Sequence, residues 1–525
     1  MKKKEIMLVL ILFLNVLVFI KPGESTISIA WTANGVAVCT AFEDQDFVQI
    51  VSDGQGGAII SWESWSYPDS YLYAQRIDSN GFVQWNIDGI SICNKSVFSS
   101  SSRIASDGEG GAFIVWEDER DWNNTKTDIY IQKINPNGTV KWASNGLEIC
   151  TAESYQIHPQ VISDKAGGVI VTWADERFGN PYSSHNTHDI YSQKIDSSGT
   201  IQWTPNGTEI CTADNFQLFP QLVSDQAGGA IITWHDNRSG ILEDIYAQRI
   251  DSDGNIKWTP NGKPICTANG YQNAPMIVND EQGGVIIAWD DGRNMADGAD
   301  IYAQKIDFNG NIYWSSNGTV ICNASDWQQK PGLVSDGQGG AIIAWEDYRN
   351  YATTECDIYA QKIDSNGISQ WSINGLEICT YDYFQYGQKL VNDGQGGVII
   401  AWEDERGSGS DIYAQWIAAN GSLQWEADGS QICIANDFQT GQQLACNGSG
   451  SVITAWKDKR DYVSTGSDVY AQKMLYHYKS SPSGTQGISF THYYILFMLV
   501  SVISLVIIIK TNMLKEHKSK SNKSF

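Results

Sequence analysis

The sequence of 525 residues is short of charge, and positive charge is especially scarce. Charged side chains make up 18% of the chain, and 60 acidic against 35 basic residues give a formal net charge of −25. Proteins that bind nucleic acid need a basic face for the phosphates, so we expect no nucleic-acid partner. The scarcity of charge, together with 49 glycines, 20 tryptophans and 24 tyrosines, favours short strands and tight turns over long surface helices.

Several chemical signatures are also missing. No two cysteines lie at the C-x-x-C spacing that is typical of zinc sites. No Ser-His-Asp arrangement and no phosphate-binding loop emerges from the sequence. We therefore expect neither a metal site nor a cofactor.

The chain does contain a segment that recurs eight times. Its second diglycine residue lies at Gly57, Gly111, Gly168, Gly229, Gly284, Gly340 and Gly397, with Ser451 at the eighth place. A tryptophan always follows five residues later, and the first residue of DIYAQ always precedes the next tryptophan by fourteen. Only the piece between the first tryptophan and DIYAQ varies, from 9 to 16 residues. This pattern predicts one exposed loop per repeat on a fixed frame.

Each repeat is typical of four antiparallel strands. These are a run ending in VSDG, an apolar run such as AIIAW, the DIYAQKID segment, and a stretch such as NIKW before an Asn-Gly turn and IC. Residues 27 to 39 supply only the last of these strands, and the eighth repeat ends on its third. Eight complete blades therefore require the first strand to complete the last blade. We predict an all-β fold, a closed eight-bladed propeller.

Seven repeats carry W-x-D-x-R followed by the aspartate of DIYAQ. Because the first repeat lacks all three charges together, we interpret the arginine as paired with both carboxylates in a structural bracket. A catalytic carboxylate pair would not occur seven times. The bracket is represented by Asp118, Arg120, Asp347, Arg349, Asp357, Asp404, Arg406 and Asp411.

The two ends of the chain are apolar. Residues 1 to 25 contain three lysines and then an apolar run from Ile6 to Ile20, which is short for a membrane span and suits a signal peptide. No A-x-A cleavage site follows, so an uncleaved anchor is the alternative. Near the other end, the run from Tyr493 to Ile509 can cross a bilayer with its flanks, and five lysines follow it.

These features predict a domain order. We expect a signal peptide or anchor at 1–25, the propeller at 27–478, a linker at 479–487, a transmembrane helix at 488–509 and a basic cytoplasmic tail at 510–525. The predicted location is the cell membrane, crossed once, with the propeller on the extracytoplasmic side.

Aromatic and histidine side chains in the variable loops are candidates for ligand binding. Aromatic rings provide contact area at low entropic cost, and a loop histidine is far more often solvated than bound to a metal. The candidates are Trp65, Tyr67, Trp122, Phe178, Tyr182, His185, His188, Tyr351 and Tyr462.

One family resemblance rests on the repeat itself. GGAIIAWEDYR, followed by DIYAQKIDSNG and QWSINGLEIC, resembles the propeller-type repeats of prokaryotic secreted and cell-surface proteins. The D-x-R…DIY portion is more loosely similar to TolB-like propeller repeats. The resemblance covers residues 27 to 474 and implies an architecture, with hardly any indication of function.

Two classes of function stay open on this basis. An extracellular polysaccharide hydrolase or lyase needs a singular acid, base or nucleophile near the propeller axis, and we find none in the repeats. We therefore predict a protein that is not an enzyme, a membrane-anchored adhesion module that binds a protein or glycan through its variable loops. The alternatives are the hydrolase or lyase and a purely structural component of the cell envelope.

Overall fold

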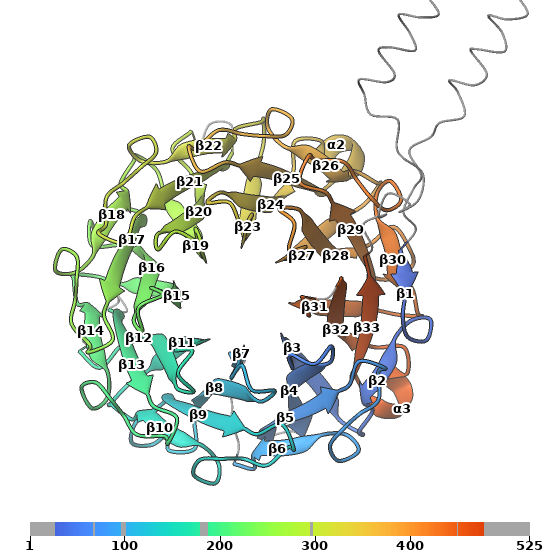
Figure 1. The fold of residues 1–525 in the computed structure, drawn as a ribbon, viewed down its shortest axis with the longest axis horizontal. Helices are drawn as coiled ribbons and strands as arrows, with labels where there is room; N and C mark the ends of the chain where they lie inside the picture. Colours follow the sequence, from blue (N-terminus) through green and yellow to red (C-terminus); the bar gives the residue numbers. More distant parts are fainter. Residues whose placement is uncertain are drawn as a thin grey trace, which may run out of the picture. The chain divides into compact units, whose positions relative to one another are not determined.

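The computed structural model describes residues 27–66, 69–95, 101–178, 187–294, 298–448 and 450–476. Its strands form eight antiparallel sheets arranged in a ring, so the predicted eight-bladed propeller is confirmed (Figure 1). The innermost strands are β3 (Asp44–Ser52), β7 (Arg103–Ser106), β11 (Gln156–Ser163), β15 (Gln217–Ser224), β19 (Gln272–Asn279), β23 (Gln328–Ser335), β27 (Gln385–Asn392) and β31 (Gln439–Cys446).

The next two strands of each blade carry the AW and DIYAQ segments. The second strands are β4 (Ala58–Ser66), β8 (Ala112–Asp118), β12 (Val169–Asp175), β16 (Ala230–Asp236), β20 (Val285–Asp291), β24 (Ala341–Asp347), β28 (Val398–Asp404) and β32 (Ser451–Asp458). The third strands are β5 (Asp69–Ile77), β9 (Asp128–Ile134), β13 (Asp189–Ile195), β17 (Asp244–Ile250), β21 (Asp300–Ile306), β25 (Asp357–Ile363), β29 (Asp411–Ile417) and β33 (Asp468–Leu475).

The fourth strand of each blade is shorter than predicted. It covers four residues ending on the repeat's cysteine, and the preceding segment adds only an isolated bridge, such as Ile250 to Ile256. These outer strands are β6 (Ile90–Cys93), β10 (Leu147–Cys150), β14 (Thr208–Cys211), β18 (Lys263–Cys266), β22 (Thr319–Cys322), β26 (Leu376–Cys379) and β30 (Ser430–Cys433). Two single-turn helices, α2 (Tyr351–Thr354) and α3 (Tyr462–Thr465), lie in variable loops.

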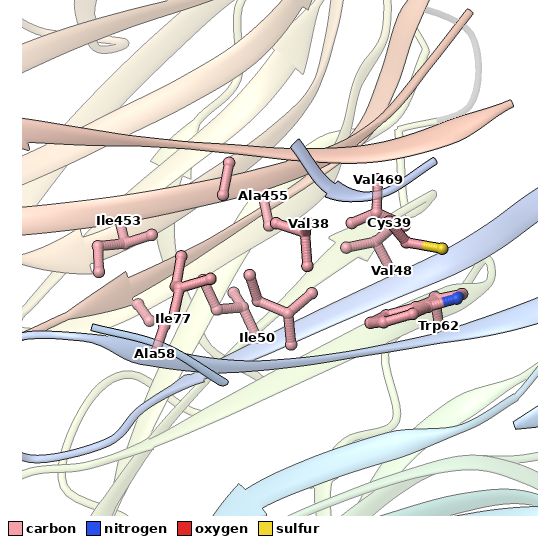
Figure 2. Close-up of a cluster of buried hydrophobic side chains, with 13 residues drawn as sticks. Val38, Cys39, Val48, Ile50, Ala58, Trp62, Ile77, Ile453, Ala455 and Val469 are labelled. Carbon is pink, nitrogen blue, oxygen red and sulfur yellow. The ribbon is translucent and has the colours of Figure 1, made fainter. Parts of the chain in front are cut away.

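The N-terminal strands complete the eighth blade, as the sequence predicts. Both β1 (Ser28–Ile29) and β2 (Val36–Cys39) pair with β33. Figure 2 shows the core at this seam, where Val38 of β2 and Ile453 of β32 face Ile50 and Trp62 of the first blade. The eight second strands are almost entirely buried, and their tryptophans are at most 1% exposed. Burial of these apolar strands between neighbouring blades is the main source of stability.

Polar clasps join most neighbouring blades in one rotational sense. The indole of Trp203 packs on Gly254 of the following blade and donates from Nε1 to the carbonyl of Ser252 at 3.1 Å. Trp31 meets Gly81 of the first blade in the same way, so the seam repeats this clasp. The seam between the seventh and eighth blades differs, because Trp425 packs against Trp416 instead.

The W-x-D-x-R aspartates hold a dense set of hydrogen bonds. Asp404 accepts from the indole of Trp402 at 2.9 Å and from both Nε and Nη2 of Arg406, at 2.7 and 2.6 Å. Arg406 also donates to the sulfur of Cys379 at 3.1 Å, so the repeat cysteines are acceptors as well as buried small residues. All ten cysteines are free.

The other bracket residues follow the same arrangement with one difference. Arg120 and Arg349 bind Asp118 and Asp347 in the same way. The DIYAQ aspartates are held by other groups. Asp357 accepts from Thr354 at 3.0 Å and from Asn350 at 3.3 Å, and Asp411 lies at the same place in its own blade.

Within the described residues, no helix is both long and apolar enough to cross a membrane. The N-terminal segment 1–25, the linker 479–487, the helix predicted at 488–509 and the basic tail all lie outside these residues. Tyr67, Tyr182 and His185 lie outside them too.

Candidate functional site

Seven of the eight innermost strands carry an irregularity at the same place, counted from the glutamine of the repeat. After the second residue the register shifts, as between Leu218 and Gln221 of β15. The residue inside this bulge has a positive φ, which is uncommon for side chains other than glycine. Its identity changes around the ring, through Phe47, His158, Phe219, Ala274, Lys330, Gly387 and Gly441.

Four of these seven bulges are held by a carboxylate from the preceding blade. The residue between the tryptophan and aspartate of W-x-D accepts a hydrogen bond from the bulge's backbone N–H. The pairs are Glu117 with His158 at 2.8 Å, Asp290 with Lys330 at 2.9 Å, Glu346 with Gly387 at 3.0 Å and Glu403 with Gly441 at 2.8 Å. Burial raises the pKa of Glu117, Asp290 and Glu403. These acids are committed to holding the blades together.

Three blades have another residue in place of this acid: Ala174 in the third, His235 in the fourth and Lys457 in the eighth. His235 is 7% exposed, and its ring lies edge-on to Phe219 at 5.0 Å. The ring of His158 lies on the other side of Phe219 at 4.4 Å. Burial lowers the pKa of both histidines to about 4, so both imidazoles are neutral at neutral pH.

Three cations face the axis, each from a single blade. Lys330 forms an ion pair with Glu346 at 3.0 Å. Lys389 is the fifth residue of β27, and Arg103 occupies the equivalent place in the second blade. The side chain of Lys389 is exposed in the cavity, although many protein atoms lie around it. Burial, and then Arg103, lower the pKa of its ammonium.

Lys330, Lys389, Phe219 and His235 all line one cavity of about 760 Å³ near the axis, a size typical of ligand sites. Its walls combine apolar groups, amides, imidazole and charges. Among its lining residues are Phe219, Gln221, His235, Glu243, Asn273, Met276, Lys330, Leu333, Glu346, Lys389, Leu390 and Gln443. Glu243 lies directly before the DIYAQ aspartate of the fourth blade and is the only acid at that place in the described blades.

The loop residues predicted as ligand-binding do not line this cavity. Trp122, Phe178, Tyr351 and Tyr462 are exposed on the variable loops of four different blades. His188 is buried beside the inner end of its loop, and Trp65 is half-buried in β4.

The axial residues were missed although the repeats contain a signal for them. When the eight innermost strands are aligned on the first place of the repeat, which is glutamine in seven of them, the third and fifth places vary in chemistry, while the sixth is always isoleucine, valine or leucine. The fifth place runs through Gln49, Arg103, Gln160, Gln221, Met276, Gly332, Lys389 and Gln443.

Comparison with known proteins identifies the architecture only. No protein-family model and no curated protein sequence matches the chain, so the predicted repeat family has no matching model. Among solved structures, an ulvan lyase of family PL25 bound to a GlcA(1-4)Rha3S unit is 11% identical, covering 75% of this chain and 96% of its own, with a TM-score of 0.44. The polysaccharide lyase Uly1 is 8% identical, covering 87% and 93%, with a TM-score of 0.44. An endo-arabinase from Bacteroides thetaiotaomicron is 15% identical, covering 50% and 95%, with a TM-score of 0.29.

The prediction that the protein is not an enzyme is wrong. Its reason was that no singular acid or base lies near the axis, and the structure places His235, Glu243 and Lys389 in the wall of the axial cavity.

Proposed function

We propose that the protein cleaves a polysaccharide and that the axial cavity is its active site. The observation that supports this proposal is the convergence of the residues that break the eightfold repeat on one cavity. A structural ring would need no such residues, because seven repetitions of one bracket already hold the blades. Groups that occur once are what catalysis requires.

The walls of the cavity suit a sugar chain. Phe219, Met276 and Leu390 offer apolar surface for the faces of pyranose rings, and Gln221 and Asn273 offer amides to hydroxyl groups. This mixture of apolar walls and a few directed polar groups is typical of small-molecule sites.

Proton transfer in this cavity is assigned to Glu243 and His235. Glu243 lines the cavity without an ion pair among the described residues, and the neutral imidazole of His235 can accept a proton. Glu346 and Glu403 are poorer candidates, because each already accepts a backbone N–H from the next blade.

The test is turnover by the full-length protein. We expect new reducing ends when it is incubated with a panel of neutral and acidic polysaccharides. Glu243→Gln and His235→Leu should each lower the rate by about 10²-fold or more. Trp122→Ala and Tyr351→Ala, in the variable loops, should leave the rate within about twofold. Loss of activity with the loop variants alone, or no cleavage of any polysaccharide, would overturn the proposal.

A further inference from the structure

Lys389 stands apart from the other inward-facing lysines of the propeller. Four of the five lysines that follow DIYAQ have a carboxylate partner, as in Lys133 with Asp107 at 3.5 Å and Lys305 with Asp280 at 3.1 Å, and the fifth, Lys473, donates to the carbonyl of Gly56 at 2.9 Å. Lys330 is paired with Glu346. The ammonium of Lys389 forms no ion pair or hydrogen bond with any described residue, although it lines the cavity. A cation that lines a cavity without a carboxylate partner is available to pair with an anionic ligand.

A second cation strengthens this contrast. Arg103 lies close enough to Lys389 to disfavour its charge, although the two strands β7 and β27 belong to blades that are not neighbours. Arg103 donates to the carbonyl of Ser102 at 2.9 Å, a neutral acceptor, and makes no ion pair within the described chain. Glu117 and Glu63 lie near Arg103 and favour its charged form. Lys389 has no such carboxylate within ion-pair distance among the described residues, so its charge is the less compensated of the two, in a chain with a net charge of −25.

The nearby acids do not cancel this charge. Glu403 and Glu346 both favour the charged form of Lys389, yet each is held by a backbone N–H of the next blade, and Glu346 also by Lys330. Repulsion from Lys330 and Arg103 works in the opposite direction. The free side of Lys389 is the side that faces the cavity.

We infer that the polysaccharide is acidic, and that Lys389 together with Arg103 binds the anionic group of the sugar that occupies the cavity. This inference rests on the proposed function and adds the class of substrate to it. Lys389 is a specificity residue here, and the anion is a carboxylate or a sulfate ester. A neutral sugar would leave Lys389 without a counter-charge and would bind more weakly.

Matched ligands test the charge directly. Binding of short oligogalacturonates to the full-length protein is compared by calorimetry with binding of the same oligomers as methyl esters, which lack the charge. Dextran sulfate oligomers and dextran form a second pair, which separates sulfate from carboxylate. We expect the charged member of at least one pair to bind about tenfold more tightly or better. Equal binding within both pairs would overturn the inference.

Variants then locate the effect. Lys389→Met should abolish the preference for the charged ligand, and Lys389→Arg should retain it. Because the pKa of Lys389 is lowered, affinity for the charged ligand should fall with rising pH, and at a lower pH than in the arginine variant. Lys257→Met is the control, because it removes one positive charge from a turn residue that is paired with Asp251. It should change neither affinity nor preference, and a loss equal to that of Lys389→Met would show that only net charge matters.

The inference and the proposed function fail in different ways. Cleavage of a neutral polysaccharide, with no charge preference, would contradict the inference and leave the proposed function standing. Binding of an acidic oligosaccharide that depends on Lys389, without any cleavage, would support the ligand class and contradict the proposed function. Thermal melting of each variant shows whether it folds. If Lys389→Met does not fold, the pH dependence of binding in Lys389→Arg, compared with that of the parent protein, still tests the inference.

Discussion

Each innermost strand contains two kinds of position: a first place that hardly varies between blades, and third and fifth places that do. The first residue is glutamine in seven of the eight repeats, and in each of these its backbone N–H binds the preceding blade, as Gln217 does with the carbonyl of His188 at 2.7 Å. The third and fifth residues differ in chemistry from blade to blade, as with Phe219 and Lys389. The first place hardly varies because all blades need the same contact with their neighbour. The third and fifth places are not needed for that contact, and residues at these places line the candidate site.

The most damaging change to the frame should be the loss of a bracket aspartate. Asp404→Ala removes the acceptor of Trp402 and leaves the guanidinium of Arg406 without its carboxylate. We expect the free energy of unfolding to fall by about 3 to 5 kcal/mol, as when one partner of a buried ion pair is removed. Urea unfolding followed by tryptophan fluorescence measures this.

Asp382→Ala provides the control for this variant. Asp382 is an exposed acid in the same blade, and its loss should change stability by less than about 0.5 kcal/mol. A similar fall in the free energy of unfolding of the two variants would mean that the bracket does not stabilise the propeller.

The clasp at the ring's seam should be the next most sensitive feature. Gly81 has a φ of +87°, and a Cβ there would lie 2.9 Å from the ring of Trp31. Gly81→Ala should therefore cost about 2 to 4 kcal/mol, from the strained backbone and the clash together. Gly54 has a φ of +68° with nothing within 4 Å of its Cβ position, so Gly54→Ala isolates the backbone cost of about 1 to 2 kcal/mol. Equal melting temperatures for the two variants would show that the clasp adds nothing.

The DIYAQ aspartates should give the frame an unusual dependence on pH. Burial raises the pKa of Asp357 to about 6 and that of Asp189 to about 7. Since the folded state then binds more protons than the unfolded chain, these groups lower the free energy of unfolding as pH rises from about 4 to their raised pKa. The neutral histidines His158 and His235 act in the opposite direction between about 4 and 6.5.

Asp357→Asn separates one of these contributions. The amide can still accept from Thr354 through its oxygen and carries no charge at any pH. We expect the variant to be more stable than the parent at pH 8, by on the order of 2 kcal/mol, and equal to it near pH 4. Parallel curves of unfolding free energy against pH for the two proteins would contradict the assignment.

The smallest effects compare the two kinds of position within one strand. Gln217 is fully buried, and its amide donates to the carbonyl of Asp214 at 3.2 Å, so Gln217→Ala should cost about 1 to 2 kcal/mol. Gln221, four residues further on, lines the cavity, and Gln221→Ala should change stability by less than about 0.5 kcal/mol. Its effect should appear in the KM for the polysaccharide instead. A larger loss of stability in Gln221→Ala than in Gln217→Ala would contradict the view that the first place stabilises the propeller and the fifth place serves the site.

The same distinction explains how much the sequence could predict. The blades, their number and the closing strand follow from spacings that repeat, because identical interfaces need identical residues. The site could not be found by looking for motifs, since His235 and Lys389 belong to none and lie far apart in the chain. What brings them together is the ring, which places the same strand position of every blade around one axis. The exposed loop aromatics were favoured because loops often bind ligands, but only the fold shows which positions meet.

The clasps have a consequence for where the chain could begin. Trp31 holds Gly81 as Trp203 holds Gly254, so the ring does not distinguish the natural ends from the other seams that are clasped in this way. Joining residues 27 and 476 through a linker and opening the chain in another variable loop, such as 239–242, would preserve the sheets and clasps described here. A circularly permuted chain would therefore form the same contacts between blades, although it would begin with a different blade.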